Sequence, residues 1–398
     1  MADRSAIEWC DSTFNPWVGC TKVSTACDHC YAEAMMSTRL GRVEWGAGKP
    51  RARTSAANWR KPLAWNKAEF RECAACGWRG EPNSVGGLTH AKDCKGSLKP
   101  ARRRVFCASL ADWLDNAAPI EWLVDLLDLI RCTPNLDWLL LTKRIGNWHK
   151  RITEAHQHVV RGFDGDEVMK RSPDTRWDLG LWIQDWLAGN APANVWLGAT
   201  ICDQNEADRD IPKLLATPAA VRFLSIEPMI GPVDVRWFIR PNVWENGRPV
   251  AGGDYGHGKK LDWIIAGGES GPHARPSHPD WFRSLRDQCA GAGVPFLFKQ
   301  WGEWRPISEG KGDWYDSLYR SNRTARDGES QGAIDELYGR TCTVATTVIH
   351  VDGSTHDNLA PGAWLQGTKP MLTFKVGKRA AGRLLDGVEH NGFPVVAR

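Results

Sequence analysis

Short apolar runs recur through the middle of the chain, and each of them ends in small or polar residues. Uninterrupted apolar character of this length is typical of strands that are buried on both faces. A further strand is predicted at residues 14–18, and helical patterns are clearest at residues 119–131 and 279–291. The predicted strands of the recurring kind are residues 104–109, 137–142, 194–200, 221–226, 261–266 and 294–298.

Strands that alternate with helices predict an α/β fold around a parallel sheet, either open or closed as a barrel. Polar residues follow these strands directly, and in parallel α/β folds the C-terminal ends of the strands surround the active site. Each residue alone also fits a helix cap or a structural ion pair, but their recurrence favours one shared site. They are Asp112, Lys143, Arg144, Glu227, Glu269, Lys299 and Gln300.

Three stretches interrupt this alternation: residues 66–103, residues 163–193, and the polar residues 305–369. We therefore divide the chain into five parts. They are 1–65, with the first strand, a cysteine loop and a helix of the barrel; 66–103, an insertion; 104–304, the remainder of the barrel; 305–369, a polar insertion or extension; and 370–398, a C-terminal segment that packs on the barrel.

The composition is that of a folded soluble protein, since 42% of the 398 residues are apolar and 25% are charged. The apolar runs are too short to span a bilayer, and the N-terminal residues lack the apolar core of a secretory signal. We therefore expect a cytoplasmic protein that does not bind membranes. A net charge of +4 does not by itself indicate a nucleic-acid partner.

The twelve cysteines are not expected to form disulfides in a reducing compartment. Half of them fall into two tight groups, and grouped cysteines at short spacing usually hold metal. The others are scattered, as is typical of small buried apolar residues. The scattered ones are Cys10, Cys107, Cys132, Cys202, Cys289 and Cys342.

The first group has the spacing C-x6-C-x2-C and consists of Cys20, Cys27 and Cys30. Three thiolates can hold three irons of a 4Fe–4S cluster and leave the fourth iron open for S-adenosylmethionine (SAM), as a radical SAM enzyme requires. Zinc is the alternative, with His29 or Cys10 as the fourth ligand. The commoner radical SAM spacing is C-x3-C-x2-C, so the spacing alone leaves both interpretations open.

The second group has the spacing C-x2-C-x13-H-x3-C and consists of Cys73, Cys76, His90 and Cys94. Two close pairs of such ligands predict a tetrahedral zinc site in the insertion. The alternatives are an auxiliary iron–sulfur cluster and free thiols in a loop. A metal commonly replaces the apolar core that so small a module lacks.

Basic residues bracket this second group along the chain. A solvated surface is the ordinary interpretation, but together they also fit a patch that faces the phosphates of a nucleic acid. Before the group stand Arg51, Arg53, Arg60 and Lys61, and after it Lys99, Arg102, Arg103 and Arg104.

Several segments resemble a phage and prophage family of unknown function. That family is related through its three-cysteine motif to the radical SAM superfamily, with a partial similarity to the spore photoproduct lyase type. The segments are FNPWVGCTKVSTACDHCYAE, LLLTKR, FLSIEPMIG, WIIAGGESG, FLFKQWGEW and VGKRAAGRLLDG. The resemblance implies a partial (β/α) barrel, a 4Fe–4S cluster at Cys20, Cys27 and Cys30, and SAM as cofactor. The wide first cysteine interval belongs to the family's pattern.

The resemblance also suggests ligands for the SAM amino group. Gly267, Gly268 and Glu269 resemble the Gly-Gly-Glu element that holds this group in radical SAM proteins. That element usually follows the second strand, whereas here it follows a late one. Ser109 and Asp112 follow the second strand in this chain and are the alternative ligands.

Three more residues are candidates for the rest of SAM. Glu227 fits the ribose hydroxyls or a helix cap. Lys143 and Arg144 fit the SAM carboxylate or a substrate phosphate. For each of them a purely structural role is the alternative.

These observations predict an α/β protein with a partial (β/α) barrel of the radical SAM type and a small zinc-binding insertion. The first functional hypothesis is an enzyme that cleaves SAM with an electron from a donor and abstracts hydrogen from a substrate, with a nucleic-acid base or nucleotide as the leading candidate. The second is a non-enzymatic, zinc-stabilised phage protein that binds nucleic acid. A hydrolase or transferase is disfavoured, because no nucleophile–base set or phosphate loop is recognisable.

Overall fold

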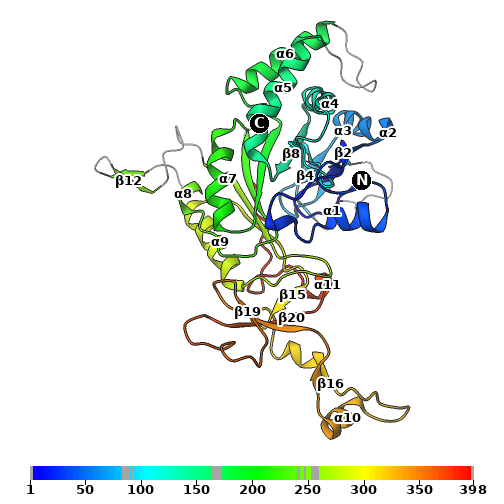
Figure 1. Cartoon of the computed structure of the whole chain (residues 1–398), viewed down its shortest axis with the longest axis vertical. Helices are drawn as coiled ribbons and strands as arrows, with labels where there is room; N and C mark the ends of the chain where they lie inside the picture. The colour runs from blue at the N-terminus through cyan, green and yellow to red at the C-terminus, as the bar shows by residue number, and fades with distance from the viewer. Residues whose placement is uncertain are drawn as a thin grey trace.

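A seven-stranded parallel sheet forms the centre of the computed structural model, which describes residues 3–82, 90, 94–162, 173–239, 243–245, 248–251 and 260–395 (Figure 1). Every neighbouring pair in it is parallel. Its strands, in spatial order, are β1 (Ser12–Phe14), β7 (Arg103–Cys107), β8 (Leu136–Thr142), β9 (Val195–Ile201), β10 (Val221–Ile226), β13 (Trp263–Gly267) and β14 (Phe296–Gln300). The chain is therefore an α/β protein with a parallel half-barrel, as the sequence predicts.

The predicted strands are confirmed to within two residues, except at the N-terminal edge. There the expected single strand is two short ones, β1 and β2 (Trp17–Val18), separated by Asn15 and Pro16. Proline lacks the amide that would continue the ladder with β7. The chain therefore leaves the main sheet, and β2 pairs instead with β3 (Ala52–Arg53).

Helices cover the outer face of the half-barrel. They are α4 (Ile120–Arg131), α5 (Trp148–Val160), α6 (Pro173–Leu187), α7 (Gln204–Ala216), α8 (Arg236–Ile239) and α9 (Pro279–Ala292). The helices predicted at residues 119–131 and 279–291 are confirmed as α4 and α9. The stretch 163–193 is more than an interruption, because α6 buries Leu179, Ile183 and Trp186 at helical spacing. Among the described helices none is both long and apolar enough to cross a bilayer.

The two faces of the sheet bury separate cores. Side chains that alternate along each strand pack either against the helices, as Trp138 and Leu140 do, or against the opposite face, as Leu139 does. The core on the face away from the helices is rich in aromatic residues and includes Trp9 from the N-terminal segment. These aromatic side chains fill part of the half-barrel, so the space left for a ligand lies towards the C-terminal ends of the strands.

The C-terminal segment covers the free edge of β14. The amide of Phe298 donates to the carbonyl of His390 at 3.0 Å, and the amide of Gly392 donates to that of Phe296 at 2.9 Å. The Trp301 indole also donates to the Leu384 carbonyl at 2.7 Å. An exposed edge strand would otherwise present unpaired backbone groups to other chains.

Residues 305–369, predicted as a polar extension, contain strands of a second, antiparallel sheet, which lies below the half-barrel in Figure 1. Its spatial order is β15 (Trp304–Pro306), β20 (Met371–Lys375), β18 (Thr346–Ile349) and β19 (Thr355–His356). Beyond it lies a small lobe that contains β16 (Tyr319–Arg320), α10 (Gln331–Tyr338) and β17 (Thr341–Cys342).

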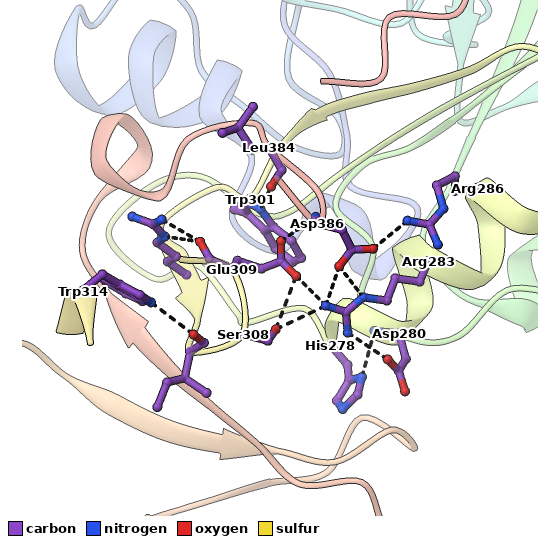
Figure 2. A network of polar contacts seen from close by, with 12 residues as sticks. His278, Asp280, Arg283, Arg286, Trp301, Ser308, Glu309, Trp314, Leu384 and Asp386 are labelled. Atoms are coloured by element: carbon purple, nitrogen blue, oxygen red, sulfur yellow. Dashed lines mark hydrogen bonds and ion pairs between the residues drawn. The ribbon is translucent and has the colours of Figure 1, made fainter. Parts of the chain in front are cut away.

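A charged network joins this second sheet to α9 and to the C-terminal segment (Figure 2). Arg283 on α9 forms ion pairs with Glu309 at 2.6 Å, with Asp386 at 2.7 Å and with Asp280 at 3.1 Å. Burial raises the pKa of the Glu309 carboxyl, and the positive charge of Arg283 opposes that rise. The Glu309 side chain is only 1% exposed, so its charge depends on this partner.

Replacing Arg283 with methionine is therefore expected to lower the free energy of unfolding by about 3 kcal/mol, because it leaves a buried carboxylate without its cation. The matched control is Arg286→Met, whose side chain is exposed to a similar degree but pairs with the more exposed Asp287 and Asp386. The control should cost only about 0.5 kcal/mol. Urea unfolding followed by tryptophan fluorescence measures both, and equal losses would contradict the special role of Glu309.

Candidate functional site

A cavity of about 440 Å³ opens at the C-terminal ends of the parallel strands. The seven strand-end residues that the sequence singles out all line it, and so does Ser109. They come from loops after β7, β8, β10 and β13 and from β14 itself, which lie far apart in the sequence. Their meeting in one cavity follows from the parallel topology, in which these ends share one edge of the sheet.

Cys20, Cys27 and Cys30 also line this cavity. They lie on a loop, residues 20–30, which we call the cysteine loop. It follows β2, contains the 3-10 turn η1 (Thr25–Cys27) and runs into the helix α1 (Tyr31–Glu33), which continues as the π-helix η2 (Ala34–Arg39). Ser24 begins η1 by accepting the amide of Ala26 at 3.0 Å.

Cys20, Cys27 and Cys30 are not arranged as a compact site for a single ion in this structure. Ligand atoms around one zinc lie about 4 Å apart, as follows from a zinc–sulfur bond of about 2.3 Å. Among the residues that the structure describes, the single group of three or more candidate ligand atoms all within 4.8 Å of one another is the other cysteine group. Cys20, Cys27 and Cys30 therefore do not form such a group with each other or with His29.

The two candidates for a fourth zinc ligand are placed differently. Cys10 is buried in the aromatic core and its thiol donates to the Ser5 hydroxyl at 3.3 Å. His29 lines the cavity, with its ring 5.7 Å from that of His273. Burial raises the pKa of the Cys10 thiol to about 12, which disfavours the thiolate that binds metal.

Arg144 and Asp112 meet at the Cys20 end of the cysteine loop. The guanidinium of Arg144 donates to the Cys20 thiol at 3.3 Å, to the Thr21 carbonyl at 2.6 Å and to Asp112 at 3.0 Å. Burial raises the pKa of the Cys20 thiol to about 11, and the Arg144 charge opposes that rise only in part. A bound metal, which displaces the thiol proton, would remove this cost.

Both carboxylate oxygens of Asp112 are occupied. One accepts from the Thr142 hydroxyl at 2.7 Å and from the Leu114 amide at 2.9 Å. The other accepts from the Lys143 amide and from Arg144, each at 3.0 Å. Asp112 thus ties the loop after β7 to the end of β8.

Glu269, from the Gly-Gly-Glu element, binds Arg275 with both oxygens. One oxygen accepts from the backbone amide of Arg275 at 2.8 Å and from its Nε at 2.9 Å, and the other accepts from its Nη2 at 2.8 Å. Arg275 also reaches the cysteine loop, donating to Asp28 and to the Thr25 carbonyl at 3.0 Å each. The sequence does not single out Arg275, which stands in an irregular loop without periodicity.

The two glycines before Glu269 permit close packing. A Cβ atom on Gly268 would lie 2.0 Å from the Trp301 carbonyl oxygen, and one on Gly267 would lie 2.9 Å from a carboxylate oxygen of Glu227. A side chain at Gly268 would therefore push the end of β13 away from the Trp301 backbone, whereas one at Gly267 would mainly displace the Glu227 side chain. This packing is a structural reason for the Gly-Gly pair, independent of any ligand.

Glu227 and Lys299 form an ion pair of 3.0 Å on the cavity wall. Although burial would lower the pKa of Lys299, attraction to Glu227 raises it on balance, so the lysine stays protonated. Beside them, Gln300 donates to the Ser270 hydroxyl at 2.8 Å, while its buried side-chain oxygen has no partner among the described residues. This wall is therefore polar but carries no net charge.

Ser109 and Lys143 complete the predicted set. The Ser109 carbonyl accepts from the Tyr31 hydroxyl at 2.6 Å, and its hydroxyl accepts from Asn15 at 3.0 Å. The Lys143 ammonium lines the cavity and has no ion pair within the described part of the chain. Lys143 is thus a cavity cation that remains available to an anionic group.

The second cysteine group forms a compact site outside the cavity. The ligand atoms of Cys73, Cys76, His90 and Cys94 all lie within 4.8 Å of one another, and the sulfurs of Cys73 and Cys94 are 3.7 Å apart. Hydrogen bonding, led by the Cys76 amide, lowers the pKa of the Cys73 thiol to about 6, which favours a metal-binding thiolate. Residues 91–93, between His90 and Cys94, lie outside the described residues.

Cys73 of this group lies in β4 (Arg71–Cys73), which pairs with β5 (Arg79–Gly80) and β6 (Leu98–Pro100) in a three-stranded sheet. The strands are short and contain few apolar residues. Arg79 attaches the sheet to the barrel by an ion pair of 3.1 Å with Asp11.

The basic residues around this insertion are mostly engaged inside the molecule. Arg103 pairs with Glu81, and the Arg104 guanidinium lies 4.0 Å from the ring centre of Phe393. Burial lowers the pKa of Arg104 to about 10. The other pairs are Arg51–Asp115, Arg53–Asp125, Lys61–Asp3 and Arg102–Asp137. Arg60 and Lys99 are exposed, and a patch that faces phosphates stays a prediction.

The family comparison extends over nearly the whole chain. Residues 4–394 match the model of a family described as a protein of unknown function, DUF5131. No curated protein and no solved structure matches the chain.

Proposed function

This chain belongs to the DUF5131 family of unknown function, and from its cavity we propose that it is a radical SAM enzyme. The observation that carries the proposal is the placement of Cys20, Cys27 and Cys30 around one cavity of a parallel half-barrel. Cysteine thiolates are the usual ligands of iron–sulfur clusters. A set of three thiolates suits a 4Fe–4S cluster with one iron left open.

The three cysteines would hold three irons and leave the fourth to SAM. When bound and reduced, the cluster would supply the electron for the reductive cleavage of SAM. The chain's own residues bind and orient the reactants and keep water out. Trp9 and Phe106 line the cavity and provide apolar walls that protect a reactive species.

Lys143 and Glu227 are the proposed contacts to SAM outside the cluster. The unpaired Lys143 ammonium suits the SAM carboxylate, because a charge-assisted hydrogen bond is strong in a sheltered site. Glu227 suits the ribose hydroxyls as an acceptor. The cavity wall made by the Glu227–Lys299 ion pair and Gln300 is polar and has no net charge. Such a wall favours a neutral substrate group with both hydrogen-bond donors and acceptors, such as a nucleic-acid base.

The compact Cys73–Cys76–His90–Cys94 site is proposed to hold zinc, since three sulfurs and one nitrogen at this spacing match tetrahedral structural zinc. Its role would be to fold the insertion. An electron donor is the further partner that the reaction requires.

Cleavage of SAM by the anaerobically reduced protein tests the proposed function. We expect 5′-deoxyadenosine to accumulate slowly without the true substrate, as measured by chromatography. Lys143→Met should raise the SAM concentration needed for half-maximal cleavage on the order of tenfold. Lys150→Met, on the exposed face of α5, is the matched control and should change nothing. If a fully loaded, reduced cluster forms no 5′-deoxyadenosine, the proposal fails and the non-enzymatic binding protein becomes the better hypothesis.

A further inference from the structure

The cysteine loop is fastened at both ends by arginines that come from other parts of the barrel. Arg144, after β8, holds the Cys20 end, and Arg275, after β13, holds the Cys27 end. Each arginine is in turn held by a buried carboxylate, Asp112 or Glu269, of which each is 5% exposed. Two separate acid–arginine pairs thus act on one loop.

A contact between an arginine and the cysteine loop is stronger when the guanidinium is already held in place. A free arginine loses side-chain entropy when it binds a loop, whereas a guanidinium bound by a carboxylate has lost most of that entropy already. Glu269 contacts Arg275 through three hydrogen bonds of 2.8–2.9 Å, one of them to its backbone amide. Three N–H donors of the guanidinium remain, and of these one on Nη1 reaches Asp28 and one on Nη2 reaches Thr25.

The same arrangement occurs at the other end of the loop. Asp112 holds Nη1 of Arg144, which also touches the Cys20 sulfur, while Nη2 donates to the Thr21 carbonyl. Arg51 adds a bond of 2.7 Å to the Thr21 hydroxyl and is itself paired with the buried Asp115. The arginines therefore hold the loop through two backbone carbonyls, those of Thr21 and Thr25, and through the side chains of Cys20, Thr21 and Asp28.

We propose that Asp112 and Glu269 are positioning residues, each of which orients an arginine that clamps one end of the cysteine loop. The clamps set the separation of Cys20 from Cys27 and Cys30. The inference rests on the proposed function only in naming a cluster as what the loop is held for. It departs from the role that the Gly-Gly-Glu resemblance implies, in which Glu269 binds the SAM amino group.

The hydrogen bonds already made by the carboxylate oxygens of Glu269 and Asp112 favour the positioning role over binding of the SAM amino group. Glu269 already accepts three hydrogen bonds from Arg275, which leaves about one acceptor site of its carboxylate for an ammonium group. Buried carboxylates that are already paired gain little from a second cation. The acceptor sites of Asp112 are filled, because its two oxygens accept four hydrogen bonds.

Amide hydrogen exchange in the metal-free protein tests the clamp directly. The loop amides of Cys27 and Asp28 donate to the carbonyls of Ser24 and Thr25 and should exchange slowly while the loop is held. Arg275→Met should speed exchange across residues 20–30 on the order of tenfold, because it removes two charged hydrogen bonds to the loop. Arg275→Lys should restore part of the protection.

Arg283→Met is the matched control for general destabilisation. Arg283 resembles Arg275 in exposure, 25% against 30%, and in its nearly buried glutamate partner, but it contacts the second sheet instead of the cysteine loop. It should leave exchange of residues 20–30 unchanged. Unaltered exchange in Arg275→Met, or equal acceleration in the two variants, would overturn the clamp.

Glu269→Gln separates the clamp from a SAM ligand. As a positioning residue it should accelerate exchange of the loop in the metal-free protein, and iron loading should fall with it. If exchange stays at the level of the unchanged protein while only SAM affinity drops, Glu269 binds SAM and the clamp is wrong. Because the exchange is measured without metal or SAM, the clamp can stand even if no cluster ever forms.

Discussion

Replacing Cys27 with alanine is expected to abolish the broad absorbance near 400 nm of the anaerobically purified protein and to remove its cluster iron, about four atoms per chain. Two remaining thiolates cannot hold a 4Fe–4S cluster that also leaves one iron open. Cys20→Ala and Cys30→Ala should behave in the same way. Iron analysis together with visible spectroscopy measures the loss, and the zinc content should not change.

Cysteines outside the cavity serve as matched controls. Cys10→Ala removes the alternative fourth ligand for zinc at the first cysteine group, and Cys132→Ala removes an exposed thiol on the barrel. Both should keep full iron content, although the buried Cys10 variant should lose about 1 kcal/mol of stability through a small cavity. Full iron content in the triple variant of Cys20, Cys27 and Cys30 would refute the assignment. Iron loss in Cys10→Ala would add that thiol to the ligand set.

The parallel strands were predictable because both of their faces are buried. A strand such as β10 must be apolar on each side, so it stands out as a continuous run that needs no long-range information. The first strand was predicted less well, since its continuity depends on which edge it pairs with. Pro16 prevents one pairing with the main sheet, and β2 then finds a partner in β3, more than thirty residues later.

The roles of charged residues were harder to predict. A run such as Arg102–Arg103–Arg104 looks the same in sequence whether the side chains meet solvent or the interior. In the fold, Arg104 packs on Phe393 from the far end of the chain, and Arg103 pairs with Glu81. Such pairing is decided by tertiary contacts between distant segments, so the sequence alone does not tell which arginines of the run are exposed.

The candidate site was also predictable only in part. The polar residues at the strand ends could be predicted to share a cavity, because the parallel topology brings them together at one edge of the sheet. Their partners could not be found in the same way, since Arg275 lies in an irregular loop and meets the cysteine loop some 250 residues away. The polar stretch 305–369 is a similar case, as β18 is stabilised by antiparallel pairing with β20 beyond the stretch.

Removing the metal from the insertion is expected to unfold the insertion alone. No described residue between 66 and 103 belongs to the buried hydrophobic clusters of the barrel. Phe70 and Cys73 are buried, but this is little apolar burial for a module of this size. We therefore expect β4, β5 and β6 to depend on the ion, since structural zinc contributes on the order of 10 kcal/mol to such modules. Cys73→Ala should therefore release the zinc and raise hydrogen exchange in residues 71–80 and 98–100 to that of an unfolded peptide.

The barrel should keep its cluster and its SAM cleavage in the same variant, because the insertion is joined to it mainly through polar contacts such as Arg79–Asp11. Cys342→Ala, which changes a cysteine of the outer lobe, is the matched control and should retain the zinc. Metal analysis and exchange on one sample separate the possible results. If Cys73→Ala also empties the cavity of iron, the insertion supports the barrel as a whole. If it keeps both zinc and protection, the four residues do not form the site.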